Sequence, residues 1–215
     1  MLSNLLQGFT LLGEEWVLWI LMALSAISVG VIIERFFFFR SHRLPGAEEL
    51  ERRLAQGDVA YARKALEGQR GLEAAVVREA LDASDRGSES VDEAISAAAT
   101  RERLRYESRL TMLGTLGNNG PFIGLFGTVL GIIRAFHDLA TAPPSAKAGA
   151  ASAVMSGISG ALVATAVGLA VAIPAVIAFN VYQRWLKRLS ASATALGHAW
   201  QSHLKSVARD ERPGA

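Results

Sequence analysis

Two threonines, Thr128 and Thr165, are the polar side chains best placed to do chemistry in this sequence, because each lies in a long stretch without a charge. Thr165 lies in an uncharged run from residue 148 to 183, and Thr128 in one from 110 to 133. In an apolar helix, a hydroxyl can donate to its own backbone one turn earlier, or it can line a polar path. The residue type alone leaves both roles open.

Each threonine interrupts a stripe of small residues on one helix face. Small side chains let another helix approach closely and are typical of helix contacts in membranes. The stripes therefore predict close helix packing through their glycines. The first stripe is Gly117, Pro121, Gly124, Thr128 and Gly131, and the second is Gly157, Ala161, Ala164, Thr165, Gly168 and Ala172.

Three stretches are apolar and long enough to cross a bilayer, which takes about 20 residues at about 1.5 Å each. The first, residues 16–33, is followed by Glu34, Arg35 and four phenylalanines rather than by the small residues of a cleavage site. We therefore expect a retained span, with Trp16 and Trp19 at one membrane interface and residues 36–39 at the other. The predicted fold class is an all-α membrane protein with three transmembrane helices and long cytoplasmic helical extensions.

The basic residues predict the orientation of the spans. Residues 1–33 hold no Lys or Arg, residues 35–109 hold 14, residues 134–153 hold two and residues 184–212 hold six. Basic segments stay on the cytoplasmic side, so the N-terminus is expected outside and the C-terminus inside. The expected segments are an outer N-terminus (1–15), a first span (16–36), an inner helical domain (37–109), a second span (110–137), an outer loop (138–152), a third span (153–182), and an inner C-terminal helix and tail (183–215).

The inner domain carries charge of both signs, with 14 Lys or Arg and 15 Asp or Glu over residues 34–109. Such mixing is typical of a solvated helical surface, so no nucleic-acid partner is expected. The pattern predicts two short helices within residues 48–67, broken near Gly57, and a third over residues 72–83. From residue 90 an alanine-rich helix is expected to run straight into the second span, and another to lead from the third span to about residue 207.

Several kinds of chemistry are excluded by composition. The chain has no cysteine, so a disulfide or a thiol nucleophile is impossible, and its four histidines are scattered. No nucleophile and base occur in a recognisable arrangement. We expect no catalytic residue, metal or cofactor, and no enzyme activity.

The segments PFIGLFGTVLGIIRAF (121–136) and GISGALVATAVGLAVAIPAVIAFN (157–180) resemble the two signature helices of the MotA/TolQ/ExbB proton channel family, and its TolQ/ExbB branch most closely. The resemblance implies a ring, commonly a pentamer, in the bacterial inner membrane, with a periplasmic N-terminus and a pore lined by Thr128 and Thr165. It also implies an ExbD/TolR-type partner, whose single span carries an Asp inside the ring. The output would pass to a TonB/TolA-type protein or a gliding effector.

Gly160 departs from the family pattern, because many TolQ and ExbB relatives carry a Glu at this place. The third span holds no acidic or basic side chain, and a threonine cannot titrate near neutral pH. Either the partner supplies the carboxylate, or the protein does not conduct ions and is a structural membrane scaffold. The paired motifs favour the first alternative.

Other residues of the spans have more than one possible role. Pro174 removes a backbone hydrogen bond from the third span, as a static kink or as a hinge. Arg134, near the outer end of the second span, is expected to reach the membrane interface. Three asparagines near the inner boundary are expected either to bond between helices or to line the inner pore mouth; they are Asn118, Asn119 and Asn180.

Overall fold

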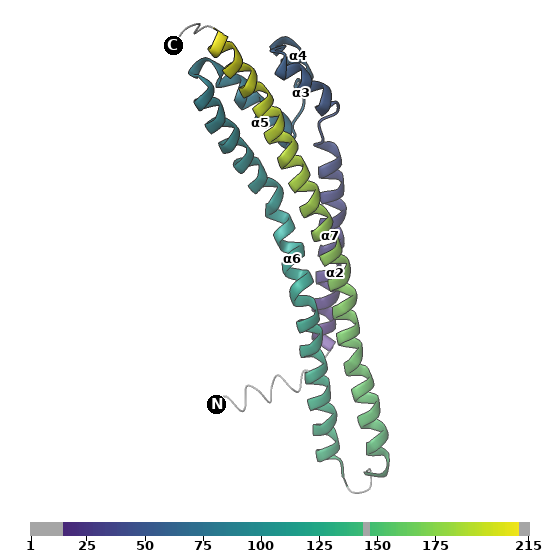
Figure 1. Ribbon diagram of the computed structural model, residues 1–215. Helices are drawn as coiled ribbons and strands as arrows, with labels where there is room; N and C mark the ends of the chain where they lie inside the picture. Colours follow the sequence, from purple (N-terminus) through teal and green to yellow (C-terminus); the bar gives the residue numbers. More distant parts are fainter. Residues whose placement is uncertain (1–14, 144–146, 211–215) are drawn as a thin grey trace. The chain divides into compact units, whose positions relative to one another are not determined.

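The computed structural model describes residues 15–143 and 147–210, and these are almost entirely helical. Most of the expected outer N-terminus, the middle of the expected outer loop and the last residues of the tail lie outside the described residues. The elements are α2 (Glu15–Ser41), α3 (Ala47–Ala55), α4 (Val59–Ala65), α5 (Leu72–Asp82), the short 3-10 helix η1 (Ser84–Arg86), α6 (Ser88–Thr141) and α7 (Lys147–Asp210) (Figure 1).

The helix breaks fall where glycine permits a left-handed backbone. Gly57 has φ 80° and separates α3 from α4, and Gly87 has φ 95° and precedes α6. After Gly57 the carboxylate of Asp58 accepts a hydrogen bond from the Tyr61 N–H at 3.0 Å and so caps α4. These breaks, and the long helix that enters the second uncharged stretch, confirm the expected helical pattern.

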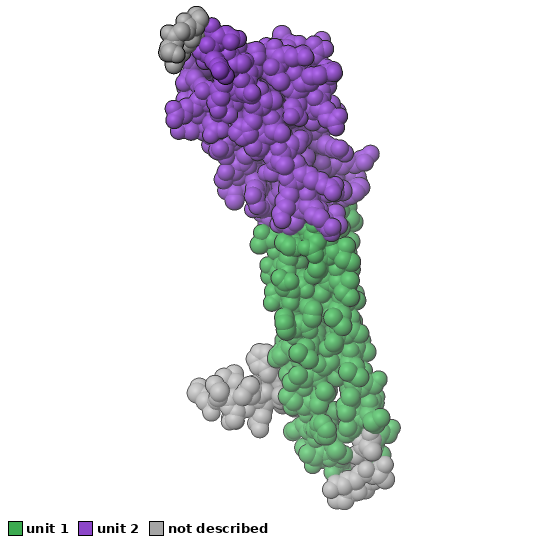
Figure 2. Space-filling view, in the orientation of Figure 1, with its two compact units in different colours: residues 1–33, 111–180 green, residues 34–110, 181–215 purple. Residues whose placement is uncertain are grey.

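Three of the helices, α2, α6 and α7, have windows that are long and apolar enough to cross a membrane, with mean hydropathy of 2.4, 1.5 and 2.5. The helix α6 continues to Thr141 and α7 begins at Lys147, so helical structure extends into the segment expected as an outer loop. The chain divides into two compact units, and all three long helices contribute residues to both (Figure 2).

Unit 1 comprises residues 1–33 and 111–180, and within it α2, α6 and α7 form a three-helix bundle (Figures 1 and 2). Val17 and Leu21 of α2 pack with Leu130 of α6 in a small core. Large apolar side chains point outward instead: Trp19 is 74% exposed and Phe122 is 68% exposed. A surface of this kind is typical of a protein that meets lipid or other apolar chains rather than water.

Unit 2 comprises residues 34–110 and 181–215, and the N-terminus of α5 holds it together. The Leu72 N–H donates to the Tyr106 hydroxyl of α6 at 3.3 Å. The buried Glu73 carboxylate accepts from the Leu44 N–H at 3.1 Å and from the Ser192 hydroxyl of α7 at 2.5 Å. One end of a short helix therefore binds α6, α7 and the chain that follows α2.

Candidate functional site

The two stripes of small residues meet each other inside unit 1. A Cβ built on Gly124 of α6 would lie 2.7 Å from the carbonyl oxygen of Ala164 in α7, and one built on Gly168 would lie 2.7 Å from the carbonyl oxygen of Gly120. These neighbours are backbone atoms, which cannot rotate away as a flexible side chain can. The close approach of α6 and α7 therefore requires glycine at Gly124 and Gly168.

The other predicted packing glycines extend this contact in both directions. A side chain at Gly117 would collide with Val176 of α7, and a Cβ on Gly157 would lie 2.8 Å from the Ala135 Cβ of α6. Gly131 is buried. The stripes thus pack against each other within one chain, whereas the spacing of small residues does not specify which helix each stripe meets.

Two further glycines belong to the same contact and were missed from the sequence. A Cβ on Gly120 would lie 3.1 Å from the Gly168 carbonyl oxygen, and one on Gly127 would lie 2.8 Å from the Ala164 Cβ and 3.1 Å from Val17 of α2. With Gly117 and Gly124 they form a series spaced by three and four residues, which is the spacing of one helix face. This spacing of glycines in the sequence could have identified Gly120 and Gly127 as packing residues.

The two threonines differ in their hydrogen bonding. Thr128 is 6% exposed, and its hydroxyl donates to the Leu125 carbonyl of its own helix at 2.6 Å. The hydroxyl oxygen of Thr165 is buried and has no hydrogen-bond partner among the described residues. The Thr165 Cα lies against the closest helix contact, 3.0 Å from a Cβ built on Gly124. Bonding to the helix backbone therefore accounts for the donor of Thr128 but not for the hydroxyl of Thr165.

The predicted hinge and inner-mouth residues lie on the surface of unit 1. Pro174 is exposed within an uninterrupted α7, and all three asparagines, Asn118, Asn119 and Asn180, are exposed. The Asn119 amide donates to the Thr115 carbonyl of its own helix at 2.8 Å, rather than to another helix. Gly160 is half-buried, and no charged residue lies between Lys147 and Arg184. Pro174 and the asparagines are therefore surface residues of unit 1, whereas Thr128 and the Thr165 hydroxyl are buried.

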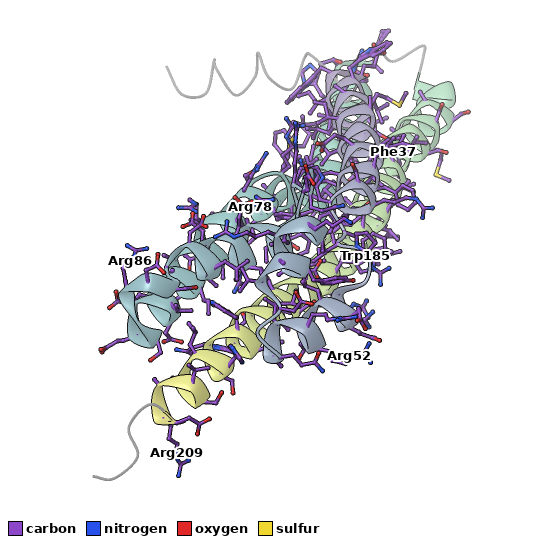
Figure 3. All side chains as sticks on the ribbon, turned by 90° about the horizontal axis from the view of Figure 1, so that it is seen from above. Phe37, Arg52, Arg78, Arg86, Trp185 and Arg209 are labelled. Carbon is purple, nitrogen blue, oxygen red and sulfur yellow. The ribbon has the colours of Figure 1, made fainter. Side chains whose placement is uncertain are left out.

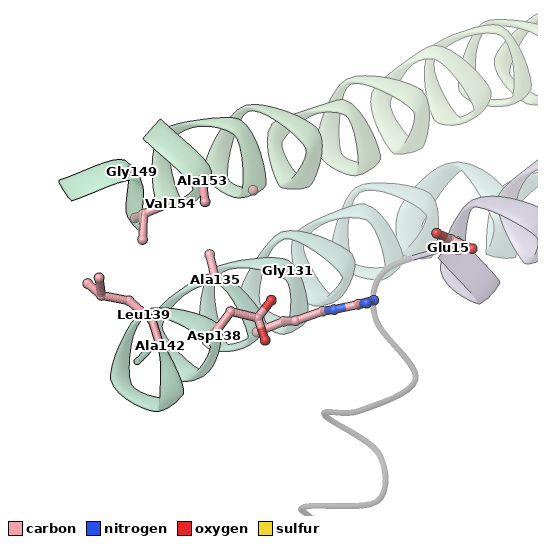
Figure 4. Close-up of a pocket in the computed structure, with 11 residues that line it drawn as sticks. Glu15, Gly131, Ala135, Asp138, Leu139, Ala142, Gly149, Ala153 and Val154 are labelled. Atoms are coloured by element: carbon pink, nitrogen blue, oxygen red, sulfur yellow. The ribbon is translucent and has the colours of Figure 1, made fainter. Parts of the chain in front are cut away.

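A pocket of about 480 Å³ lies near the C-terminal end of α6 and the N-terminal part of α7 (Figure 4). It is lined by Glu15 of α2 and by Arg134 and Asp138 of α6. These are the charged residues of unit 1 whose side chains the structure describes. The rest of its wall consists of Leu139, Val154 and small residues that include Gly131, Ala135, Ala153 and Gly157.

The composition of this pocket suits water and small hydrated ions, because two carboxylates and one guanidinium border it beside small side chains. The sequence predicts Arg134 at the membrane interface and does not connect it with Glu15 and Asp138. These residues come from two helices far apart in the sequence, so their proximity is a product of the tertiary structure.

Comparisons with known proteins agree with the helix motifs. The sequence matches the MotA/TolQ/ExbB proton channel family over residues 68–195. The Tol-Pal system protein TolQ of Pseudomonas aeruginosa is 47% identical over 92 residues, which are 43% of this chain and 38% of that protein. The biopolymer transport protein ExbB of Xanthomonas campestris pv. campestris is 41% identical over 113 residues, 52% of this chain and 42% of that protein.

A second ExbB, from Neisseria gonorrhoeae, is 46% identical over 94 residues, 44% of this chain and 41% of that protein. The chain thus spans about two fifths of the length of these relatives. The family match contains Thr128, Thr165 and the α6–α7 glycine contact, and it extends through α5. With its three apolar helices, this multi-pass membrane protein belongs to the MotA/TolQ/ExbB proton channel family, in the TolQ/ExbB branch.

Proposed function

We propose that this protein is the ring subunit, or stator, of a motor in the bacterial inner membrane that is driven by the proton-motive force. The observation that carries the proposal is the unpartnered hydroxyl of Thr165 beside the Gly124–Gly168 contact. A buried hydroxyl without a partner costs about 1–3 kcal/mol, and water or another chain in a pore would remove that cost. Thr128 retains acceptor capacity on the same hydroxyl that donates to Leu125.

The titrating group of the motor comes from a second protein. Threonine hydroxyls can pass a proton along a chain of water but do not hold a charge near neutral pH. A charged side chain at the bilayer centre costs about 2.5–3.5 kcal/mol or more, so it is kept where it functions. Because residues 148–183 hold none, we assign the carboxylate to an ExbD/TolR-type partner with one Asp-bearing span.

A closed homo-oligomer, five-fold by family resemblance, forms the channel around that partner. The outward apolar side chains of unit 1 support such an assembly, because Phe122 and Met155 are 68% and 71% exposed and offer surface to a neighbouring copy. The N-terminus is periplasmic and the C-terminus cytoplasmic, on the evidence of the basic residues. One charge that crosses 100 mV supplies about 2.3 kcal/mol to the motor.

The names of the relatives support a proposal for the output of the motor. One is a Tol-Pal system protein and two are biopolymer transport proteins. We propose that the motor energises outer-membrane transport, envelope maintenance or gliding through a TonB/TolA-type or gliding effector, and that the chain is not an enzyme.

A non-conducting membrane scaffold is the second candidate, and the glycine at Gly160 favours it. Proton flux into liposomes separates the two functions. We expect rings of this chain alone to be nearly proton-tight and co-assembled rings with the Asp-bearing partner to conduct. Equal, background-level flux with and without the partner, in a complex that has assembled, would support the scaffold.

A further inference from the structure

The seam between α2 and α7 in unit 2 is aromatic. Phe36 and Phe39 of α2 contact Trp185 of α7, with ring centroids 6.5 and 6.0 Å apart, and Phe39 stacks on Tyr182 at 5.5 Å. We call these four residues the aromatic seam. Within the seam, Phe36 is still 44% exposed, and its neighbour Phe37 is 64% exposed, although both belong to the unit that carries most of the charge (Figure 3, where Phe37 and Trp185 are labelled).

Basic residues follow the aromatic seam by one helical turn on both helices. Arg40 lies four residues after Phe36, and Arg188 lies three residues after Trp185, so each shares a face with its aromatic residue. Lys187 is next to Arg188. All three basic side chains are exposed and make no ion pair or hydrogen bond within the described residues.

No carboxylate of α7 offsets this charge, because the helix has no acidic residue before Asp210. The acidic residue nearest in sequence on α2, Glu34, is already engaged: it accepts two hydrogen bonds from Arg35 at 2.7 Å, and Arg109 lies 3.5 Å away. The basic residues beyond the aromatic seam are therefore an uncompensated positive patch. It lies directly after the apolar stretches of two membrane helices.

We propose that this patch, made of Arg40, Lys187 and Arg188 beside Phe36 and Phe37, binds the headgroup of an anionic phospholipid. Exposed aromatic rings suit the boundary between acyl chains and headgroups, and a basic side chain one turn farther on reaches about 5 Å toward the phosphate level. A soluble protein partner would need to cover the apolar rings and supply carboxylates, whereas a lipid provides acyl chains and a phosphate in this order along the helices. The inference does not depend on proton conduction.

Lipid selectivity tests the proposal with the full-length protein in bilayers of phosphatidylcholine and phosphatidylglycerol. Electron spin resonance of chain-labelled lipids gives the association of each lipid relative to the other. We expect about a fivefold preference for phosphatidylglycerol, the factor that one well-placed basic residue supplies, and a smaller preference at high salt. Equal association of the two lipids, or no lipid restricted at this face because a neighbouring subunit covers it, would overturn the proposal.

Variants test which residues cause the preference for phosphatidylglycerol. The triple change Arg40→Gln, Lys187→Gln and Arg188→Gln should abolish it, and Arg40→Lys with Arg188→Lys should keep it in a folded protein. A matched control removes the same charge elsewhere in unit 2, through Arg70→Gln, Arg86→Gln and Lys205→Gln, and should leave the preference unchanged. An equal loss in the control would assign the effect to net charge. Displacement of the labelled lipid by inorganic phosphate would show a free-anion site instead, and would also overturn the proposal.

Discussion

The hydroxyl of Thr165 is buried without a hydrogen-bond partner in the described residues, and the Thr165 Cα lies against Gly124 in the α6–α7 contact. Thr128 lies one turn beyond Gly124 on the facing helix, but its proton is bound to the Leu125 carbonyl. Two residues of the same type therefore differ in what they can offer to water or to another chain. Thr165 can still donate, and Thr128 can mainly accept.

This difference predicts unequal effects of removing each hydroxyl. Thr165→Val keeps the side-chain shape, and we expect it to reduce proton flux of the co-assembled motor more strongly than Thr128→Val does. Because Thr165→Val removes an unsatisfied buried hydroxyl, its thermal stability should be equal to or slightly above that of the unchanged protein. Flux in liposomes and thermal unfolding of the same samples provide the measurement.

Thr141→Val is the matched control, because Thr141 is exposed and bonds its own helix at 3.0 Å. Flux unaffected by the double change Thr128→Val and Thr165→Val would remove both hydroxyls from the mechanism.

A carboxylate placed at Gly160 tests the departure from the family pattern. Gly160 is half-buried, so Gly160→Glu has partial access to the surface of unit 1. If the residue faces the ion pathway, we expect assembled rings whose flux acquires a new pH dependence, since the introduced carboxyl group can bind and release a proton there. Gly160→Gln, which has the same size without a charge, should show no new pH dependence. Failure of both variants to assemble would place Gly160 at a helix contact.

At the scale of elements, α6 and α7 pack so closely that the backbone of one contacts the glycines of the other. Even alanine is too large at the closest positions, and we expect Gly124→Ala and Gly168→Ala each to lower the melting temperature and weaken assembly. Overpacking of this kind costs about 1–3 kcal/mol. Gly30→Ala in α2 is the control, because a Cβ there would meet nothing within 4 Å. Wild-type stability of Gly124→Ala would contradict the observed helix approach.

The N-terminus of α5 is a second closely packed contact, and a substitution of Tyr106 tests its hydrogen bond to Leu72. Tyr106→Phe keeps the ring but leaves the buried Leu72 N–H without its acceptor, which should cost about 1–3 kcal/mol of stability. Hydrogen exchange should rise at α5 first. Tyr61→Phe is the control, since Tyr61 is exposed and its backbone N–H makes the cap of α4. Unchanged exchange at α5 in Tyr106→Phe would show that the bond is not needed to hold this helix.

The sequence was sufficient to predict the helices and the breaks between them, but not which helices contact each other. Gly57 and Gly87 have a local conformation that other residues avoid, so the breaks beside them were predictable. The spacing of the small residues around Gly124 identified one face of α6, and the spacing around Gly168 identified one face of α7. Spacing does not specify which helix each face meets. The hydrogen bond of Thr128 depends on a side-chain rotamer, and the pocket at Glu15 and Asp138 on tertiary structure; neither leaves a periodic signal.

At the scale of the whole molecule, the proposed function requires assembly into a closed ring. The outward apolar side chains of unit 1 predict that the purified protein forms one closed oligomer, and native mass spectrometry from a mild detergent measures its size. We expect a single species, five-fold by family resemblance, with no stable monomer. The patch variant that removes Arg40, Lys187 and Arg188 serves as a control, because it should retain the oligomer. A stable monomer of the unchanged protein would contradict the ring.

The division into units has a consequence for biosynthesis. The chain passes between the units at residues 33–34, 110–111 and 180–181, each time within α2, α6 or α7. Neither unit is therefore a continuous stretch that a ribosome could finish before it starts the other. Val17 and Leu21 leave the ribosome long before Leu130, and at about 5–20 residues per second they wait several seconds for that partner. During this interval α2 is a lone span, whose retention in the membrane depends on its own hydropathy and on the insertion machinery.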